Sequence, residues 1–160
     1  MNLFKNKKIR ILKFSFYIIL LDQISKFLAI NIIDYQHSTD FIPNLLNFTL
    51  VKNKGAAFSL FSNSTTLLTI TSIFASILII TYILRSPPQS LWNSIGLSFL
   101  LGGTLGNGID RLFKGYVVDF LELIPINFPI FNLADISINI AIICFIIDLI
   151  KANNKSNLKY

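Results

Sequence analysis

The sequence has few charged residues for its length. Of its 160 residues, 14% are charged and 53% are hydrophobic, and the mean hydropathy is +0.64. A water-soluble domain of this size needs more polar surface than that to cover its core. The composition therefore excludes a soluble fold, and the 15 phenylalanines must face apolar surroundings such as lipid.

Cysteine and histidine are almost absent. The single cysteine, Cys144, lies in an apolar run, which excludes an internal disulfide and a cysteine-based metal cluster and indicates a small core residue. The single histidine, His37, excludes the H-E-x-x-H motif of zinc proteases. No G-x-S-x-G nucleophile motif is present either. We therefore expect neither a metal nor a cofactor.

Four stretches are long enough to cross about 30 Å of hydrocarbon as helices that rise about 1.5 Å per residue. We predict an all-α membrane protein of one domain, residues 1–160, with four transmembrane helices. The predicted spans are Ile11–Ile33, Thr65–Leu84, Ser90–Ile109 and Ile130–Ile150. Residues 34–64 and 110–130 are the predicted outer loops, and the short extended segments Phe41–Pro43 and Phe48–Val51 predict a small β-rich region in the first of them.

Basic residues are distributed unevenly between the two sides of this topology. Because cytoplasmic loops carry an excess of lysine and arginine, the distribution predicts both termini in the cytoplasm. The outer side then carries Lys52, Lys54, Arg111 and Lys114, and the inner side carries Lys5, Lys7, Lys8, Arg10, Arg85, Lys151, Lys155 and Lys159. Clustering at the two ends is typical of contact with anionic membrane lipid, not of a nucleic-acid groove.

Polar residues near membrane depth need an explanation because burying them in lipid is costly. Asp22 and Lys26 lie one turn apart on the first predicted helix and predict an ion pair inside the bundle. Support of a catalytic site is the alternative role for Asp22. Gly102 and Gly106 form a G-x-x-x-G step that predicts close helix packing. A further polar group flanks the second outer loop: Asn107, Asp110, Arg111, Asp119, Asn132 and Asp135.

Asp119 and Asp135 are the candidates for chemistry in this group. They lie sixteen positions apart, with Pro125 and Pro129 between them, which allows a loop to bring the two carboxyl groups together. Two close carboxyls share a proton and can act as acid and base in the hydrolysis of an amide. On the residues alone, two aspartates at a membrane interface are more often solvated or helix-capping than catalytic.

Five sequence blocks follow one another along most of the chain. They are Asp22-Gln-Ile-Ser-Lys26, Asn53-Lys-Gly-Ala-Ala-Phe-Ser59, Gly102-Gly-Thr-Leu-Gly-Asn-Gly-Ile-Asp-Arg111, Val118-Asp-Phe120 and Phe131-Asn-Leu-Ala-Asp135. In this order they resemble the D-x-x-[ST]-K, N-x-G-A-A-F and G-G-x-x-G-N-x-x-D-R blocks and the two aspartate segments of lipoprotein signal peptidases (signal peptidase II). That family consists of bacterial membrane aspartyl proteases.

The resemblance implies an endopeptidase that removes signal peptides from bacterial prolipoproteins by cleaving before the diacylglyceryl-modified cysteine. It implies a place in the bacterial cytoplasmic (inner) membrane, with the active site near the outer face. Asp119 and Asp135 would be the catalytic dyad, and Asp22, Lys26 and Asp110 would support the site structurally. The substrate-binding residues would be Asn53, Gly55, Asn107, Arg111, Asn132 and Ala134.

A non-enzymatic four-helix membrane scaffold or a small transporter is the alternative. A transporter predicts broken helices near the midplane or an inverted repeat, whereas the polar residues of this chain cluster at one interface. A scaffold would tolerate the loss of either aspartate.

The position of Asn132 predicts how the two aspartates divide their roles. Asn132 suits the N-cap of the last helix, which places Asp135 in the first turn, where the helix dipole favours a negative charge. Asp119 has apolar neighbours, which favour the protonated form. The sequence therefore predicts Asp135 as the resting base and Asp119 as the acid.

Overall fold

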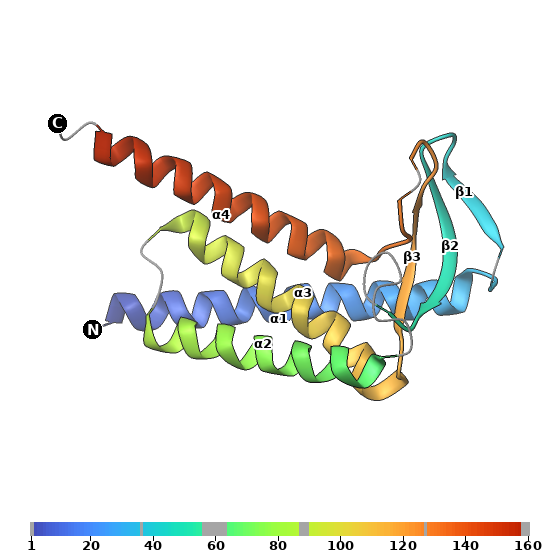
Figure 1. Ribbon diagram of the computed structural model, residues 1–160, viewed down its shortest axis with the longest axis horizontal. Coiled ribbons are helices and arrows are strands. Elements are labelled where there is room, and N and C mark those ends of the chain that lie inside the picture. Colours follow the sequence, from blue (N-terminus) through green and yellow to red (C-terminus); the bar gives the residue numbers. More distant parts are fainter. Residues whose placement is uncertain (1, 36, 56–63, 87–89, 127, 158–160) are drawn as a thin grey trace.

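Helices form a bundle with a small sheet at one end (Figure 1). The computed structural model describes residues 2–35, 37–55, 64–86, 90–126 and 128–157. The elements in them are α1 (Asn2–Ile32), β1 (Ser38–Ile42), β2 (Leu46–Asn53), α2 (Thr65–Arg85), α3 (Leu91–Lys114), β3 (Val117–Leu123) and α4 (Leu133–Asn157). The start of α1 and the end of α4 lie at the end of the bundle opposite the sheet.

The helix α3 is the centre of the bundle, since it packs against α1, α2 and α4. Its buried residues include five glycines and the polar residues Ser98, Asn107 and Asp110. Three helices of the described chain, α1, α2 and α4, are long and apolar enough to cross a membrane. Since α3 faces other helices on several sides, small and polar residues are tolerated along it, and these residues lower its hydropathy. All four predicted spans are thus helical, and three of them have membrane-spanning composition.

The ends of the helices differ from the predicted spans. The helix α1 begins at Asn2, not at Ile11, and α4 begins at Leu133, not at Ile130. The helix α3 continues to Lys114, so Asp110 lies on a helix and not in the predicted outer loop 110–130. It ends at Gly115, whose φ of 74° is the left-handed conformation that closes many helices. Hydropathy predicts which part of a helix lies in the apolar layer, whereas backbone hydrogen bonds and caps determine where the helix begins and ends.

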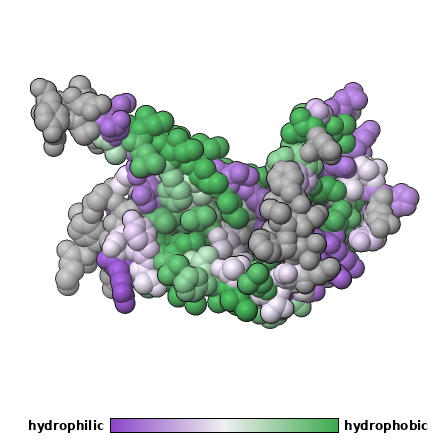
Figure 2. Space-filling view, viewed as in Figure 1, coloured by the Kyte–Doolittle hydropathy of each residue, from purple (hydrophilic) through white to green (hydrophobic). Residues whose placement is uncertain are grey.

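Apolar side chains cover α4 and the middle of the bundle, and polar side chains lie at both ends (Figure 2). Large residues on the outer helices are strongly exposed, among them Phe74 and Ile77 on α2 and Leu149 on α4. Monomeric soluble proteins rarely expose an apolar surface of this extent. The surface therefore fits a bilayer.

The sheet is antiparallel with the strand order β1-β2-β3. The predicted β-rich region in the first outer loop is confirmed, since β1 and β2 contain Phe41 and Phe48. The third strand, β3, was not predicted. It pairs with β2 so that Val51 lies opposite Asp119. One of the two candidate catalytic residues is therefore held in the sheet.

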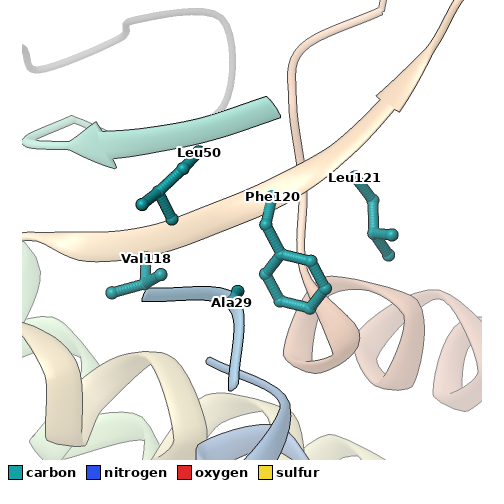
Figure 3. Close-up of a cluster of buried hydrophobic side chains, with 5 residues drawn as sticks. All are labelled: Ala29, Leu50, Val118, Phe120 and Leu121. Carbon is teal, nitrogen blue, oxygen red and sulfur yellow. The ribbon is translucent and has the colours of Figure 1, made fainter. Parts of the chain in front are cut away.

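An apolar cluster joins the sheet to the end of α1 (Figure 3). It consists of Ala29, Leu50, Val118, Phe120 and Leu121, all of which are buried. Successive side chains of a strand point to opposite faces. Because Val118 and Phe120 pack into this cluster, Asp119 between them points to the other face of β3.

Glycines bring α3 close to its neighbours. A Cβ atom on Gly102 would lie 2.6 Å from Cγ2 of Ile18 on α1, and one on Gly103 would lie 2.5 Å from the carbonyl oxygen of Ala134 on α4. A Cβ on Gly106 would lie 2.6 Å from Oδ2 of Asp22. These approaches confirm the close packing that the G-x-x-x-G step predicted, and they place the polar side chains of α1, α3 and α4 beside one another.

Candidate active site

Asp119 is held on β3 by two amide side chains. Its Oδ2 accepts a hydrogen bond from Nδ2 of Asn53 on β2 at 2.8 Å, and its Oδ1 accepts one from Nδ2 of Asn132 at 2.6 Å. The side chain is almost completely buried, with 2% exposure. Two neighbouring elements thus fix the orientation of this carboxyl group.

Asp135 lies in the first turn of α4. Its Oδ2 accepts a hydrogen bond from the backbone N–H of Asn132 at 3.1 Å, and its own N–H donates to Oδ1 of Asn132 at 3.1 Å. This reciprocal pair is a capping box, in which two otherwise unpaired donors of a helix start are satisfied. The prediction that Asn132 is the N-cap is confirmed, since the N–H of Ile136 donates to its carbonyl oxygen.

Two asparagines connect the carboxyl groups. Nδ2 of Asn107 donates to Oδ1 of Asp135 at 2.8 Å, and Nδ2 of Asn132 donates to Oδ1 of Asn107 at 3.0 Å as well as to Asp119. Because Asn132 is the cap of α4 and also a partner of Asp119, it sets the position of the helix start relative to β3. The two aspartates therefore belong to one hydrogen-bonded network.

Both aspartates line one cavity of about 460 Å³ between α3, β3 and the start of α4. Asn53, Asn107 and Arg111 contribute polar atoms to it, and apolar residues cover much of the remaining wall. The space-filling view shows the surface hollowed between α4 and the sheet (Figure 2). A cavity of this size that is mostly apolar and has a few convergent polar groups is typical of a ligand site.

Burial and a neighbouring charge change the acidity of Asp119. Loss of solvent and the negative charge of Asp135 raise the pKa of Asp119 from 3.8 to about 7. Asp135 is more exposed and lies at a helix N-terminus, where the dipole stabilises an anion. With a pKa of about 7, Asp119 keeps a proton for about half of the time at neutral pH.

A buried lysine lies behind the network. Nζ of Lys26 is 2.9 Å from Oδ2 of Asp22 and 3.2 Å from Oδ2 of Asp110, and all three side chains have 0% exposure. The same Nζ donates to Oδ1 of Asn107 at 2.9 Å. Lys26 and Asn132 both donate to that oxygen, so the amide of Asn107 can present only its NH₂ group to Asp135. Lys26 therefore orients a side chain that touches the candidate dyad.

Asp22 and Asp110 tie the elements of the site together. Oδ1 of Asp22 on α1 accepts the backbone N–H of Ala134 at 3.0 Å, which anchors the start of α4. Oδ2 of Asp110 on α3 accepts the backbone N–H of Val118 at 3.1 Å, which anchors β3. Each of these carboxylates therefore holds an element that carries one of the two aspartates.

Arg111 reaches from α3 towards the loop that follows β2. Its Nη2 is 3.4 Å from the carbonyl oxygen of Gly55, whose N–H donates to Oδ1 of Asn53 at 2.9 Å. Within the described residues, Nε of Arg111 is buried and has no hydrogen-bond partner. Residues 56–59 of the second sequence block lie outside the described residues.

Comparison with known proteins identifies the family. The model of the signal peptidase (SPase) II family matches residues 14–151. The chain belongs to the signal peptidase II family. It is 45% identical over 139 residues to a lipoprotein signal peptidase of Parasynechococcus marenigrum, covering 87% of each chain. It is also 41% identical over 151 residues to one from Streptococcus agalactiae serotype Ia, covering 94% of this chain and 98% of the other.

Solved structures agree with this relationship. A bacterial membrane enzyme solved by the in meso method at 2.3 Å resolution matches with a TM-score of 0.84 and 32% identity, covering 91% of this chain and 90% of that one. A second, at 1.9 Å resolution, matches with a TM-score of 0.80 and 33% identity, covering 89% and 93%. The chain is therefore a bacterial membrane enzyme of the aspartic signal peptidase II type.

The structure places the expected residues of this signal peptidase II at different depths. Asn53, Asn107, Arg111, Asp119 and Asp135 line the cavity together. By contrast, Gly55, Asn132 and Ala134 are buried beside the cavity wall and do not line it. Asn132 acts on both aspartates through hydrogen bonds, and Ala134 packs between α1 and α3.

Several residues of the site were not singled out from the sequence. Ile138 and Asn139 line the cavity and follow Asp135 by three and four positions, a spacing that places them on the same helix face. Gln23 donates to Asp22, to the carbonyl oxygen of Gly106 and, at 3.5 Å, to Asp110. No sequence motif marks Gln23, because its role depends on how α1 and α3 pack. Among the described residues, no group of three or more His, Cys, Asp or Glu side chains is arranged to hold a metal ion.

Proposed function

We propose that Asp119 and Asp135 are the catalytic dyad with which this enzyme cleaves prolipoproteins before the diacylglyceryl-modified cysteine. The observation that carries the proposal is the pair of carboxyl groups from β3 and α4 that line one cavity and share a network through Asn132. Curated relatives are named lipoprotein signal peptidases, which supports this substrate class and disfavours a scaffold or transporter.

The proposed mechanism starts with a water molecule between the two carboxyl groups. Asp135 takes a proton from the water molecule while the water oxygen attacks the scissile carbonyl carbon, and Asp119 gives its own proton to the carbonyl oxygen. When the tetrahedral intermediate collapses, the leaving amine takes the proton from Asp135 and the C–N bond breaks. One of the two hydroxyl groups of the intermediate returns its proton to Asp119 as the carbonyl group forms again. The raised pKa of Asp119 supports its role as the acid, because it retains the proton that the step requires.

Substrate contacts are assigned by position. Asn53, Asn107 and Arg111 have polar atoms in the cavity wall, and we assign them to the substrate backbone. Gly55, Asn132 and Ala134 are assigned to positioning, since the small residues permit close packing and Asn132 holds both aspartates. The two acyl tails of the substrate would fix the height of the scissile bond, and misplacement by one helical turn would move it about 5.4 Å.

The test compares one precursor with and without its diacylglyceryl group, incubated with purified enzyme at equal membrane density. We expect release of the signal peptide from the lipidated form and little from the other. Asp119→Asn and Asp135→Asn should each remove nearly all cleavage while membrane insertion persists, because either carboxyl group alone lacks half of the proton transfers. Equal rates for the two precursors, or substantial turnover by either variant, would refute the assignment.

We also propose that all four helices cross the cytoplasmic membrane, with both termini in the cytoplasm and the cavity near the outer face. The common end of α1 and α4 and the basic residues near it support this orientation. In a Cys144→Ser background, Asp40→Cys on exposed β1 should react with a membrane-impermeant thiol reagent in whole cells. Asn154→Cys, which is also exposed, should react only after lysis. The reverse labelling pattern would contradict the orientation.

A further inference from the structure

A second cavity lies at the end of the bundle opposite the candidate dyad. It has a volume of about 520 Å³ and is a groove between the beginnings of α1 and α3. Volumes of about 300–1,000 Å³ are typical of small-molecule sites. None of the catalytic or substrate-binding assignments uses this groove.

The groove has an apolar floor along its length. Phe14 of α1 and Ile95 and Phe99 of α3 contribute large apolar side chains to the wall. Ser94 and Ser98 make room between them, and their hydroxyl groups donate to the carbonyl oxygens one turn earlier, at 2.8 and 2.9 Å. Since those hydroxyl donors are already satisfied, the wall can contact a hydrocarbon chain without leaving them unpaired.

One end of the groove is positively charged. Lys7 and Arg10 line it there, three positions apart on the same face of α1 as Phe14. The described lining contains no acidic side chain, and none of the ion pairs in the described part of the chain involves Arg10. The N-terminus of α3, capped by Ser90, adds partial positive charge on the opposite wall. Positive charge at the mouth of an apolar groove suits an anion with a long apolar tail.

We propose that this groove binds an anionic phospholipid, with its phosphate at Lys7 and Arg10 and one acyl chain along Phe14, Ile95 and Phe99. The guanidinium of arginine has several N–H donors in one plane, so Arg10 can bind the phosphate oxygens by directed hydrogen bonds and not by charge alone. From Lys7 to Phe14 the helix rises about 10 Å, which is the length of a partial acyl chain below a headgroup. The bound lipid fills the gap between α1 and α3 at the end where the sheet does not hold them together.

The only tryptophan of the chain, Trp92, provides the measurement, because it lies one residue after Leu91, which is itself in the groove wall. The full-length enzyme is reconstituted into phosphatidylcholine vesicles that contain 10 mol% of phosphatidylglycerol with brominated acyl chains. Bromine quenches tryptophan fluorescence at short range. Brominated phosphatidylcholine at the same mole fraction gives the background from unselected lipid. We expect an apparent preference for phosphatidylglycerol of about thirtyfold, because Lys7 and Arg10 should each contribute about fivefold, or about 1 kcal/mol.

Matched variants separate a site from general surface charge. Arg10→Gln should reduce the preference about fivefold, whereas Lys13→Gln, which removes the same charge from an exposed position outside the groove, should change it less than twofold. Ser94→Phe should lower quenching by occupying the groove with both charges retained, and Leu67→Phe on the exposed surface of α2 should not.

Three outcomes would overturn the proposal. The first is equal quenching by the two brominated lipids, and the second is an equal effect of the Arg10 and Lys13 variants. The third is quenching that falls as protein density rises, which would indicate that a second copy of the chain covers the groove. The preference should persist in Asp119→Asn enzyme, so that the result does not depend on the proposed catalytic role.

Discussion

Replacing Lys26 with methionine tests whether a buried cation organises the candidate active site. The side chain has 0% exposure, and its Nζ contacts the carboxylates of Asp22 and Asp110 as well as Oδ1 of Asn107. Methionine keeps much of the volume and removes the charge and all three contacts. The change therefore leaves two buried carboxylates without their shared cation.

The size of the stability loss in Lys26→Met follows from the partners that each carboxylate retains. Asp110 keeps Lys114 at 2.9 Å, whereas Asp22 keeps only the neutral donors Gln23 and the N–H of Ala134. Removing one partner of a buried ion pair costs about 3–5 kcal/mol. For a protein of this length, roughly 2–4 °C of melting temperature corresponds to 1 kcal/mol. We expect Lys26→Met to lower the melting temperature by roughly 6–20 °C.

Lys114→Met is the matched control. It removes the same chemical group from the same acceptor, Asp110, at 2.9 Å, but the lysine is 32% exposed and does not contact Asn107. Such a pair is worth about 0.2–1 kcal/mol, so the melting temperature should fall by no more than about 4 °C. Thermal unfolding of the detergent-purified variants, followed by circular dichroism, provides the comparison.

Activity separates the positioning role of Lys26 from its effect on stability. The double variant Asp22→Asn/Lys26→Met removes both charges of the pair, so it should recover part of the lost stability. Cleavage, measured well below the melting temperature, should remain at least tenfold below wild type, because Asn107 loses one of the two donors that hold its NH₂ group towards Asp135. Equal melting temperatures for the two lysine variants, or full activity in the double variant, would refute the reasoning.

Two further predictions concern packing and pH. Gly103→Ala places a Cβ 2.5 Å from the carbonyl oxygen of Ala134 and should displace the start of α4, lowering both melting temperature and cleavage. Gly108→Ala, whose Cβ meets only the side chain of Ser72 at 3.3 Å, should do so far less, and similar losses in both variants would contradict this. The pKa of Asp119 is raised from 3.8 to about 7, so the folded enzyme holds this proton more tightly than the unfolded chain. The contribution of this proton to stability is fully present below about pH 4 and is lost as pH rises through about 7. Over that range the free energy of unfolding should fall by up to about 1.4 kcal/mol per pH unit. Asp119→Asn should remove this dependence from melting temperatures measured between pH 4 and 8. An unchanged slope in that variant would show that other groups cause it.

Much of the fold was predictable because lipid imposes a simple pattern. The length of the apolar segments located the helices, and the extended segments Phe41–Pro43 and Phe48–Val51 indicated a small β region. The sequence did not reveal β3, since Val117–Leu123 is buried on both faces and lacks the alternation that marks a half-buried strand. The span Ser90–Ile109 was predicted and, from Leu91 on, lies within α3, but α3 is not among the helices with membrane-spanning hydropathy, because its glycines and amides face other helices.

The candidate site was predictable where the signal is local. The capping role of Asn132 and the pairing of Asp22 with Lys26 depend on residues three or four positions apart, and both are present. The contact of Lys26 with Asn107, 81 positions away, and the anchoring of β3 by Asp110 depend on how the helices pack. Sequence reasoning assigned Lys26 and Asp110 a supporting role but could not give their partners, since tertiary contacts have no periodicity along the chain.

The two lysine–carboxylate pairs also bear on how the chain enters a bilayer during synthesis. Asp22 and Lys26 lie four positions apart on α1, and Asp110 and Lys114 lie four apart on α3. In each pair the acid precedes the base, which is the more favourable order along a helix. Each of these two helices can therefore neutralise the carboxylate of its pair as it forms, without a contact to another helix. The two carboxylates that later share Lys26 therefore each have a cation on their own helix before the bundle assembles, which lowers the cost of bringing them into a bilayer.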